Sequence, residues 1–310
     1  MRVVFFGTPQ FAVPGLAALL DAGIDVVAVV TQPDRPGGRS HSTLVAPPVK
    51  TFAITAGLPV WQPERPRGDL FLQQLRTSGA DLGIVVAYGH ILPAELLAVP
   101  PLGLVNVHAS LLPRWRGAAP IQWAILSGDR QTGVGVMRIE AGLDTGAIWL
   151  ERTTAIHEDD TAATLSDRLS SLGAEALLDA LPDIAAGIAP RPQDPVNATY
   201  ASKVDRALAR IRWNEGVHEV SCRIRAMDPH PGAWSVHHGS DIKLFGPRID
   251  SRSAQSSDPP GTMASDHGDL VVSTGGGTLR IDSVQPAGRR RMPSREWLRG
   301  LDLTVGARFE

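Results

Sequence analysis

An amide and an imidazole stand two residues apart in the stretch VNVHASLLPRWRG, which covers residues 105–117. The neighbouring Val105 and Val107 predict a buried strand, and side chains two apart on a strand point to the same face. Asn106 and His108 therefore share a face near the carboxyl end of the strand, where open α/β sheets usually bind ligands. The pair indicates acid–base chemistry, because an imidazole moves protons and an amide can donate to an oxyanion.

Asp144 is a third candidate, in the turn-rich stretch EAGLDTG between two predicted strands. Gly142 and Gly146 relieve the backbone there, and such turns project carboxylates. If this hairpin packs beside the strand of His108, the trio suits acyl transfer to an amine. His108 would relay the amine proton, Asn106 would polarise the acyl oxygen, and Asp144 would fix the imidazole tautomer or hold a proton-carrying water. An alternative stays open, in which the three side chains only satisfy strand-end and turn backbone groups.

The loop after this strand combines apolar and cationic side chains. Leu111, Leu112 and Trp115 could hold a flat heterocycle, while Arg114 and Arg116 address a carboxylate or phosphate. Trp115 could equally be a packing residue.

A second long segment, residues 32–50, contains four prolines and two adjacent glycines and lacks periodicity. Loops of this length in a compact domain are usually functional or disordered. Its basic residues Arg35, Arg39 and Lys50 make an anionic partner possible.

Other motifs point away from familiar chemistries. The stretch GTPQF after the first strand lacks the G-x-G-x-x-G spacing of a dinucleotide site. His230, His237 and His238 have no Cys or acidic cluster at ligand spacing beside them, so we expect surface histidines and no metal. The single cysteine, Cys222, excludes an internal disulfide and is expected to be a small core residue.

Apolar runs alternate with amphipathic stretches in the first part of the chain. This alternation predicts an α/β fold with a doubly wound, mostly parallel, Rossmann-like sheet covered by helices on both faces. Residues 132–156 predict an antiparallel addition to that sheet, and residues 161–187 predict a long amphipathic helix. Short strands at regular spacing then predict a small, OB-like β-barrel.

A Pro-rich, aperiodic stretch separates the two patterns. We therefore expect a catalytic domain over residues 1–188, a linker over 189–205 and the barrel over 206–310.

The 310 residues, with 43% hydrophobic and 20% charged, are typical of a globular protein with about two domains. The amino terminus does not resemble a signal peptide, and no apolar stretch approaches about 18 residues, so we expect a cytoplasmic protein without membrane spans. Residues 1–200 hold 14 basic against 19 acidic side chains, and residues 201–310 hold 16 against 13. The net charges of −5 and +3 hint that the second part meets an anionic partner.

Together, the stretches FFGTPQFAVPGL, TQPDRPGGR, PPVK, VVAYGHILP, HASLLPRWRGAAPIQWAI and GLDTG resemble the folate-dependent formyltransferases, and QPAGRRRM extends the resemblance to the second domain. The family shares an Asn, a His and an Asp in this order. The resemblance implies that Asn106, His108 and Asp144 are catalytic. It also implies a folate site formed by Ser110, Leu111, Leu112 and Pro113.

The resemblance further implies 10-formyltetrahydrofolate as formyl donor, without a metal, and the α-amino group of initiator methionyl-tRNA as acceptor. The barrel would help to hold tRNA, and we expect a monomer. Many family members have lysines after the Gly-Arg of TQPDRPGGR, where this chain has Ser40, His41 and Ser42, so we expect Arg39 to be the chief tRNA contact of the loop. Ala109 replaces a glycine common in the family.

Three other functions are alternatives. A folate formyltransferase for a small-molecule amine, either a ribonucleotide or an amino sugar nucleotide, would share the catalytic strand, as would a hydrolase that releases formate. A non-catalytic RNA-binding protein would use the barrel alone, but the intact trio argues against it.

Overall fold

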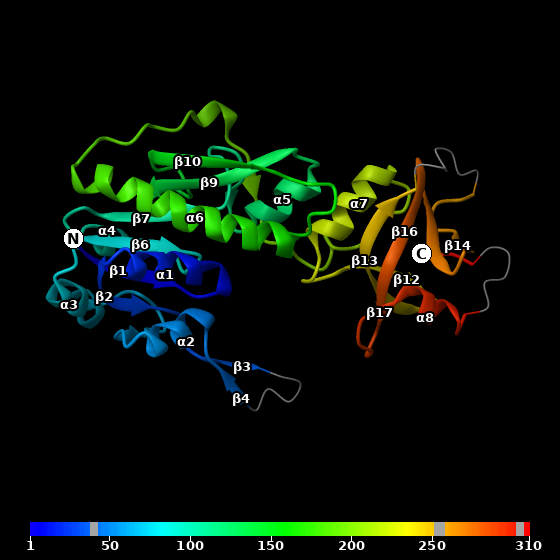
Figure 1. The fold of residues 1–310 in the computed structure, drawn as a ribbon, viewed down its shortest axis with the longest axis horizontal. Coiled ribbons are helices and arrows are strands. Elements are labelled where there is room, and N and C mark those ends of the chain that lie inside the picture. The colour runs from blue at the N-terminus through cyan, green and yellow to red at the C-terminus, as the bar shows by residue number, and fades with distance from the viewer. Residues whose placement is uncertain (38–42, 251–257, 302–306) are drawn as a thin grey trace. The chain divides into compact units, whose positions relative to one another are not determined.

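The computed structural model describes residues 1–37, 43–250, 258–301 and 307–310 (Figure 1). The chain forms two compact units. The first unit contains residues 1–117, 132–154 and 166–200, and the second contains residues 118–131, 155–165 and 201–310. In the described ranges, no helix is both long and apolar enough to cross a membrane.

A seven-stranded sheet in the order β10-β9-β7-β6-β1-β2-β5 forms the first unit. Five strands run parallel, and β9 pairs antiparallel with β7. The strands are β1 (Arg2–Gly7), β2 (Asp25–Val30), β5 (Val60–Trp61), β6 (Leu82–Val86), β7 (Leu104–His108), β9 (Gln131–Arg138) and β10 (Ile148–Ala155). This mostly parallel sheet with an antiparallel addition confirms the expected fold class.

The strands are apolar because helices cover both faces of a sheet of this kind. All five residues of β6 are buried, as are five of the six in β1. The helical segments of this region are η1 (Gln10–Ala12), α1 (Val13–Asp21), α2 (Pro48–Thr55), α3 (Asp69–Ser78), α4 (Ala94–Leu97) and α6 (Ala162–Ala185). Proline at the start of α1 and α2 suits the first helical turn, and Gly79 ends α3 in the left-handed conformation (φ 62°).

The long helix α6 lies along one face of this sheet (Figure 1). A Cβ atom on Gly173 would be 2.9 Å from Val107 Cγ1, so glycine lets the helix approach the strand that carries His108. Ser170 Oγ also donates to the backbone oxygen of Phe11 at 2.6 Å. The helix α6 therefore packs against β7 on the face that carries Val107.

Short segments complete the first unit. Strands β3 (Arg35–Gly37) and β4 (Thr43–Val45) pair antiparallel within the segment expected to lack regular structure. Strand β8 (Arg116–Gly117) pairs with β11 (Tyr200–Ala201), and a short helix η2 (Pro195–Asn197) precedes β11.

An antiparallel sheet dominates the second unit, in the order β12-β13-β16-β15-β14, with β17 paired to β16. Its strands are β12 (Ala233–His237), β13 (Ser240–Ile249), β14 (Met263–Asp266), β15 (Asp269–Thr274), β16 (Gly277–Pro286) and β17 (Met292–Pro293). The helices α5 (Pro120–Leu126) and α7 (Val217–Ala226) pack together, and α8 (Ser294–Leu298) follows β17. Cys222 is buried in α7, which confirms its predicted place.

The last four residues join the two edges of this sheet. Met263 N donates to Ala307 O at 2.8 Å on the β14 side, and Glu310 N donates to Val236 O at 2.9 Å on the β12 side. Phe309, only 1% exposed, stacks between the Trp213 and Trp297 rings at 5.4 and 6.1 Å. This carboxyl-terminal segment therefore gives the antiparallel sheet a barrel-like closure.

His237 differs from its prediction as a surface residue. Its side chain is buried, with its ring edge-on to Trp297 and Phe309. Burial lowers the pKa of His237, because the charged imidazolium loses its hydration. His230 and His238 are exposed, as expected.

Candidate active site

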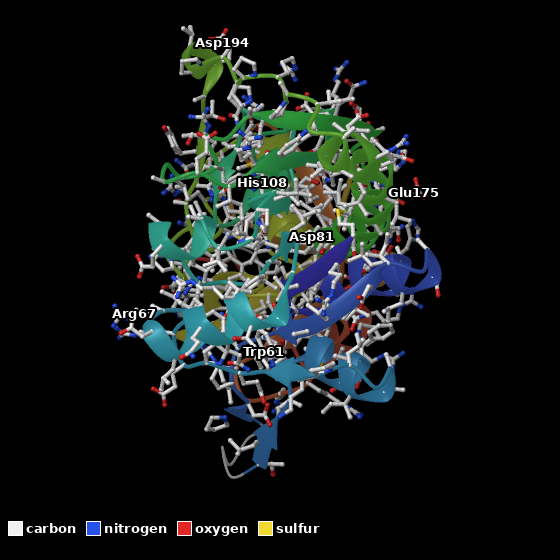
Figure 2. All side chains as sticks on the ribbon, turned by 90° about the vertical axis from the view of Figure 1, so that its left-hand side faces the viewer. Trp61, Arg67, Asp81, His108, Glu175 and Asp194 are labelled. Carbon is white, nitrogen blue, oxygen red and sulfur yellow. The ribbon has the colours of Figure 1, made fainter. Side chains whose placement is uncertain are left out.

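His108 is the last residue of β7 and is 5% exposed. Its Nε2 lies 3.0 Å from the carbonyl oxygen of Trp115. A carbonyl only accepts hydrogen bonds, so Nε2 must carry a hydrogen, and Nδ1 is the nitrogen left to take up a proton. Figure 2 labels His108 in the interior of the sheet region.

The loop after β7 turns back so that the Trp115 carbonyl can meet His108. Trp115 adopts a positive φ of 62°, which a bulky residue holds only when its surroundings fix it. Its N–H donates to Thr199 Oγ1 at 2.9 Å, and the N–H of Arg116 donates to Thr199 O at 2.9 Å. Ser110 Oγ closes the loop by donating to Arg114 O at 2.6 Å.

Asp144 lies in the turn between β9 and β10, and its carboxylate faces the imidazole. The Asp144 Oδ2 atom is 3.7 Å from His108 Nδ1 and accepts a hydrogen bond of 2.8 Å from Gly117 N. A separation of 3.7 Å is too long for a direct hydrogen bond, so the carboxylate acts on Nδ1 by charge or through a bridging water. The structure thus brings together two of the three predicted catalytic side chains.

Asn106 is half-buried and lies two residues before His108, so both side chains leave the same face of β7. Its amide makes no hydrogen bond to any residue in the described ranges. The strand therefore offers an uncommitted amide donor beside a proton-accepting nitrogen, and a carboxylate faces that nitrogen.

The site can bind an acyl oxygen at the amide and take a proton at Nδ1, with the charge of the resulting imidazolium offset by Asp144. Those are the two needs of acyl transfer to an amine.

The four predicted folate residues differ in their accessibility. Ser110 and Leu112 are buried at 0% and 5% exposure, and Leu112 packs with Met137 and Ile148. Leu111 and Pro113 are half-buried and keep surface that a ligand could contact. A direct folate contact is therefore more readily made by Leu111 and Pro113, while Ser110 and Leu112 support the loop from inside.

The two arginines of this loop were predicted to contact a ligand, and Arg116 does not fit that prediction. Arg116 is 5% exposed, and its guanidinium donates to Gln193 Oε1 at 2.6 and 3.1 Å. Arg114 is exposed and stacks over the Trp115 ring at 4.4 Å. Arg116 is thus a structural residue, and Trp115, at 8% exposure, is a packing residue.

Gln193 and Thr199 contribute to the site but carry no signal in the sequence. Both lie in the Pro-rich, aperiodic stretch expected to be a linker. Their partners, Arg116 and Trp115, are more than 70 residues away in the chain, so no local spacing could indicate the contacts.

A polar network follows the carboxyl ends of the neighbouring strands. Gln32 Nε2 and Thr8 Oγ1 both donate to Tyr88 O at 2.9 Å. Asp34 accepts from Gln62 at 2.8 Å and pairs with Lys50 at 2.7 Å. The hydrogen bonds from Gln62 and Lys50 lower the pKa of Asp34.

This network fixes the point where the β3–β4 hairpin leaves the sheet. Arg39, the predicted tRNA contact, lies outside the described residues, so its contact stays a prediction.

Burial raises the pKa of Tyr88, just after β6, to about 12, which keeps its phenol neutral.

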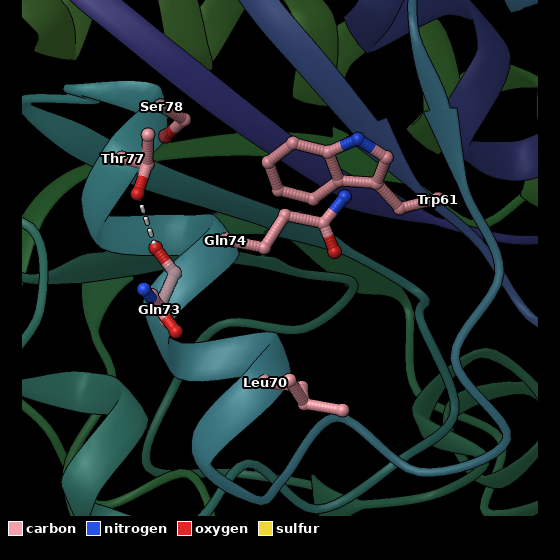
Figure 3. A pocket seen from close by; sticks show the side chains of 6 residues that line it. All are labelled: Trp61, Leu70, Gln73, Gln74, Thr77 and Ser78. Carbon is pink, nitrogen blue, oxygen red and sulfur yellow. Dashed lines mark hydrogen bonds between the residues drawn. The ribbon is translucent and has the colours of Figure 1, made fainter.

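An open hollow on the surface lies between β5 and α3 (Figure 3). Its lining contains none of the predicted site residues and no ionisable side chain. It consists of Trp61, Leu70, Gln73, Gln74, Thr77 and Ser78. The hollow therefore offers no acid–base chemistry.

Among the described residues, no group of three His, Cys, Asp or Glu side chains is placed to hold a metal ion.

The chain belongs to the formyl transferase family. Residues 1–181 match the family model for formyl transferase, and residues 203–302 match the formyl transferase C-terminal domain. A methionyl-tRNA formyltransferase of Methylococcus capsulatus is 47% identical over 96% of each chain. Another of that name, from Thiobacillus denitrificans, is 44% identical over 100% of this chain and 99% of its own.

Two solved structures share the fold. HypX from Aquifex aeolicus in complex with tetrahydrofolic acid has a TM-score of 0.68 at 20% identity, over 96% of this chain and 47% of its own. An N-formyltransferase from Helicobacter canadensis, in complex with folinic acid and dTDP-3-aminofucose, has a TM-score of 0.67 at 19% identity, over 92% of this chain and 99% of its own.

Proposed function

We propose that this protein transfers the formyl group of 10-formyltetrahydrofolate to the α-amino group of initiator methionyl-tRNA. The observation that carries the proposal is the His108–Asp144 pair at the end of β7, beside the uncommitted amide of Asn106. Family membership supports formyl transfer, and the names of relatives that match the chain over nearly its whole length support methionyl-tRNA as acceptor. The small-molecule amine is the less favoured acceptor.

The α-amino group of an aminoacyl ester is partly unprotonated near neutral pH and needs little activation. As its nitrogen bonds to the formyl carbon, negative charge develops on the formyl oxygen, and the Asn106 amide donates to that oxygen. His108 Nδ1 accepts the proton that the attacking nitrogen releases, while Nε2 stays bonded to Trp115 O. When the bond from carbon to the folate nitrogen breaks, the imidazolium returns the proton to that nitrogen, so no net proton is consumed.

Asp144 stabilises the imidazolium during this cycle. Its Oδ2 atom is 3.7 Å from Nδ1 and is held by the N–H of Gly117. The carboxylate is 17% exposed, so its charge acts on the imidazole with less screening than at the open surface. The site needs no Ser or Cys nucleophile.

The folate fits the described residues at two points. The Asn106 amide is free to meet a formyl oxygen, and Leu111 and Pro113 keep apolar surface for a flat ring. We assign the catalytic domain to residues 1–188, the connecting segment to 189–205 and the tRNA-binding barrel to 206–310. The excess of basic residues after position 200 supports the barrel as a tRNA contact, and we propose Arg39 as a further contact. The aminoacyl-tRNA substrate supports a cytoplasmic location, and we propose that the protein works as a monomer.

Single-turnover formyl transfer by the His108→Ala and Asp144→Asn variants tests the catalytic assignment. We expect each rate to fall by about 100-fold or more, because general acid–base catalysis contributes about 10²–10⁴-fold. Asp183→Asn, on the exposed side of α6, is the matched control and should leave the rate unchanged. A His108→Ala variant within about tenfold of the wild-type rate, equal to ~1.4 kcal/mol of barrier, would refute the role of His108.

A further inference from the structure

Asp144 holds an unusual backbone conformation that its own side chain does not explain. Its φ is 49°, in the left-handed region that residues other than glycine seldom adopt. Asp144 Oδ2 accepts from Gly117 N and faces His108, and within the described residues the carboxylate makes no hydrogen bond to its own turn. Something else must fix the backbone from which the carboxylate projects.

The side chain of Gln193 meets this backbone directly. Gln193 Nε2 donates to Asp144 O at 2.9 Å and to Gly146 O at 2.7 Å. Both hydrogens of the amide are therefore used on the two carbonyls that flank the turn. One side chain thus sets the direction of the peptide groups that follow Asp144 and Gly146.

Arg116 fixes which way the Gln193 amide points. The guanidinium donates through Nε and one terminal nitrogen to Gln193 Oε1, at 3.1 and 2.6 Å. A guanidinium cannot accept a hydrogen bond, so the amide oxygen must face Arg116 and the amide nitrogen must face the turn. Since Arg116 itself is 5% exposed and leaves the loop that carries Trp115, the bond ties the Asp144 turn to the loop that holds His108.

The chain segment around Gln193 also contacts this loop. Thr199 accepts from Trp115 N and Arg116 N, and Arg191 pairs with Ile148 at the start of β10. Figure 2 labels Asp194, next to Gln193, at the outer edge of the sheet region. The segment 191–199 is therefore bonded to both sides of the His108–Asp144 pair.

We propose that Gln193 is a positioning residue, which sets the place of the Asp144 carboxylate opposite His108 Nδ1 by holding the carbonyls of Asp144 and Gly146. The proposal rests on the proposed function, since it assumes that Asp144 is catalytic. Gln193 itself does not reach the imidazole in this account and acts through the turn. A misplacement of a reacting group by about 1 Å can slow catalysis by about 100-fold.

Three variants separate this role from a structural one. Gln193→Ala removes the hydrogen bonds to the Asp144 turn and those from Arg116. Gln193→Glu has the same shape and keeps an acceptor for Arg116, but an ionised carboxylate cannot donate to Asp144 O and Gly146 O. Asn197→Ala is the matched control, because its amide bonds to Asp194 and to no other residue of the described ranges, within the same exposed segment.

Single-turnover formyl transfer and KM for both substrates are measured for each variant, with thermal unfolding as the check on folding. We expect Gln193→Ala and Gln193→Glu to lose about 10- to 100-fold in rate with KM unchanged, and Asn197→Ala to match the wild type. In an Asp144→Asn background, Gln193→Ala should add less than about threefold, because the carboxylate it places is already gone.

Two results would overturn the proposal. A Gln193→Glu variant with the wild-type rate would show that pairing with Arg116 is the whole role of the side chain. A loss by Gln193→Ala that is as large with Asp144→Asn as without it would show that Gln193 acts elsewhere. Failure of the proposed function gives a different pattern, in which Asp144→Asn alone keeps the wild-type rate.

Discussion

Gly146→Ala would place a methyl group inside the hairpin that carries Asp144. A Cβ atom built on Gly146 lies 1.8 Å from the carbonyl oxygen of Arg138, and real Cβ atoms essentially never come closer than 3.0 Å to another heavy atom. The two backbone segments would have to separate by at least 1.2 Å, the difference between those distances. Since the clash is with backbone, no side-chain rotation relieves it.

The displacement should slow the reaction more than it destabilises the fold. Overpacking of this kind costs about 1–3 kcal/mol of unfolding free energy. A shift of about 1 Å at Asp144, two residues away, should lower the rate of formyl transfer by about 100-fold, equal to ~2.7 kcal/mol of barrier. Single-turnover transfer and thermal unfolding measure the two effects separately.

Gly135→Ala is the matched control in the same hairpin. Gly135 pairs with His108 across the sheet, yet its added Cβ would meet atoms no closer than 3.7 Å, which is ordinary contact. We expect it to keep a rate near that of the wild type. The reasoning fails if Gly146→Ala transfers within about threefold of the wild-type rate while remaining folded, since the position of Asp144 would then matter little.

Three further outcomes follow from the same structure. Asn106→Ala should lower the transfer rate by about 100-fold with little change in folate dissociation constant, and an effect on folate binding alone would contradict its oxyanion role. Phe309→Ala should lower the free energy of unfolding, measured by chemical denaturation, by about 3–5 kcal/mol, because the Phe309 ring lies between Trp213 and Trp297. A decrease of less than about 1 kcal/mol would contradict the barrel-like closure. The pKa of His237 is lowered below its ordinary 6.5, so the unfolded chain takes up the proton first as the pH falls. The free energy of unfolding should therefore decrease as the pH drops below about 6.5. If the melting temperature of the His237→Gln variant depended on pH in the same way as that of the wild type, this role of His237 would be excluded.

The sheet and the catalytic strand were predictable because their signals are local. Near-continuous apolar runs indicate strands buried on both faces, and the i, i+2 spacing of Asn106 and His108 sets their common side. Asp144 was predictable as a turn residue, whereas its distance from His108 required the packing of β9 beside β7.

The support for the site was not predictable, because it depends on polar contacts between distant segments. Gln193 and Thr199 lie in an aperiodic stretch that resembles a linker, and their partners are set by tertiary structure. For the same reason Arg116 was misinterpreted as a ligand contact. His237 was misinterpreted as a surface residue because the rings that bury it, Trp297 and Phe309, come at least 60 residues later in the chain.

The acceptor assay tests the central claim most directly. The purified chain is given labelled 10-formyltetrahydrofolate with either initiator methionyl-tRNA or a nucleotide-linked amino sugar, and the His108→Ala variant serves as the background. We predict transfer to methionyl-tRNA with a kcat/KM at least about 10³-fold above that for the amino sugar nucleotide, since an acceptor that leaves polar binding groups unpaired is strongly rejected. Equal or faster transfer to the amino sugar nucleotide would contradict the account.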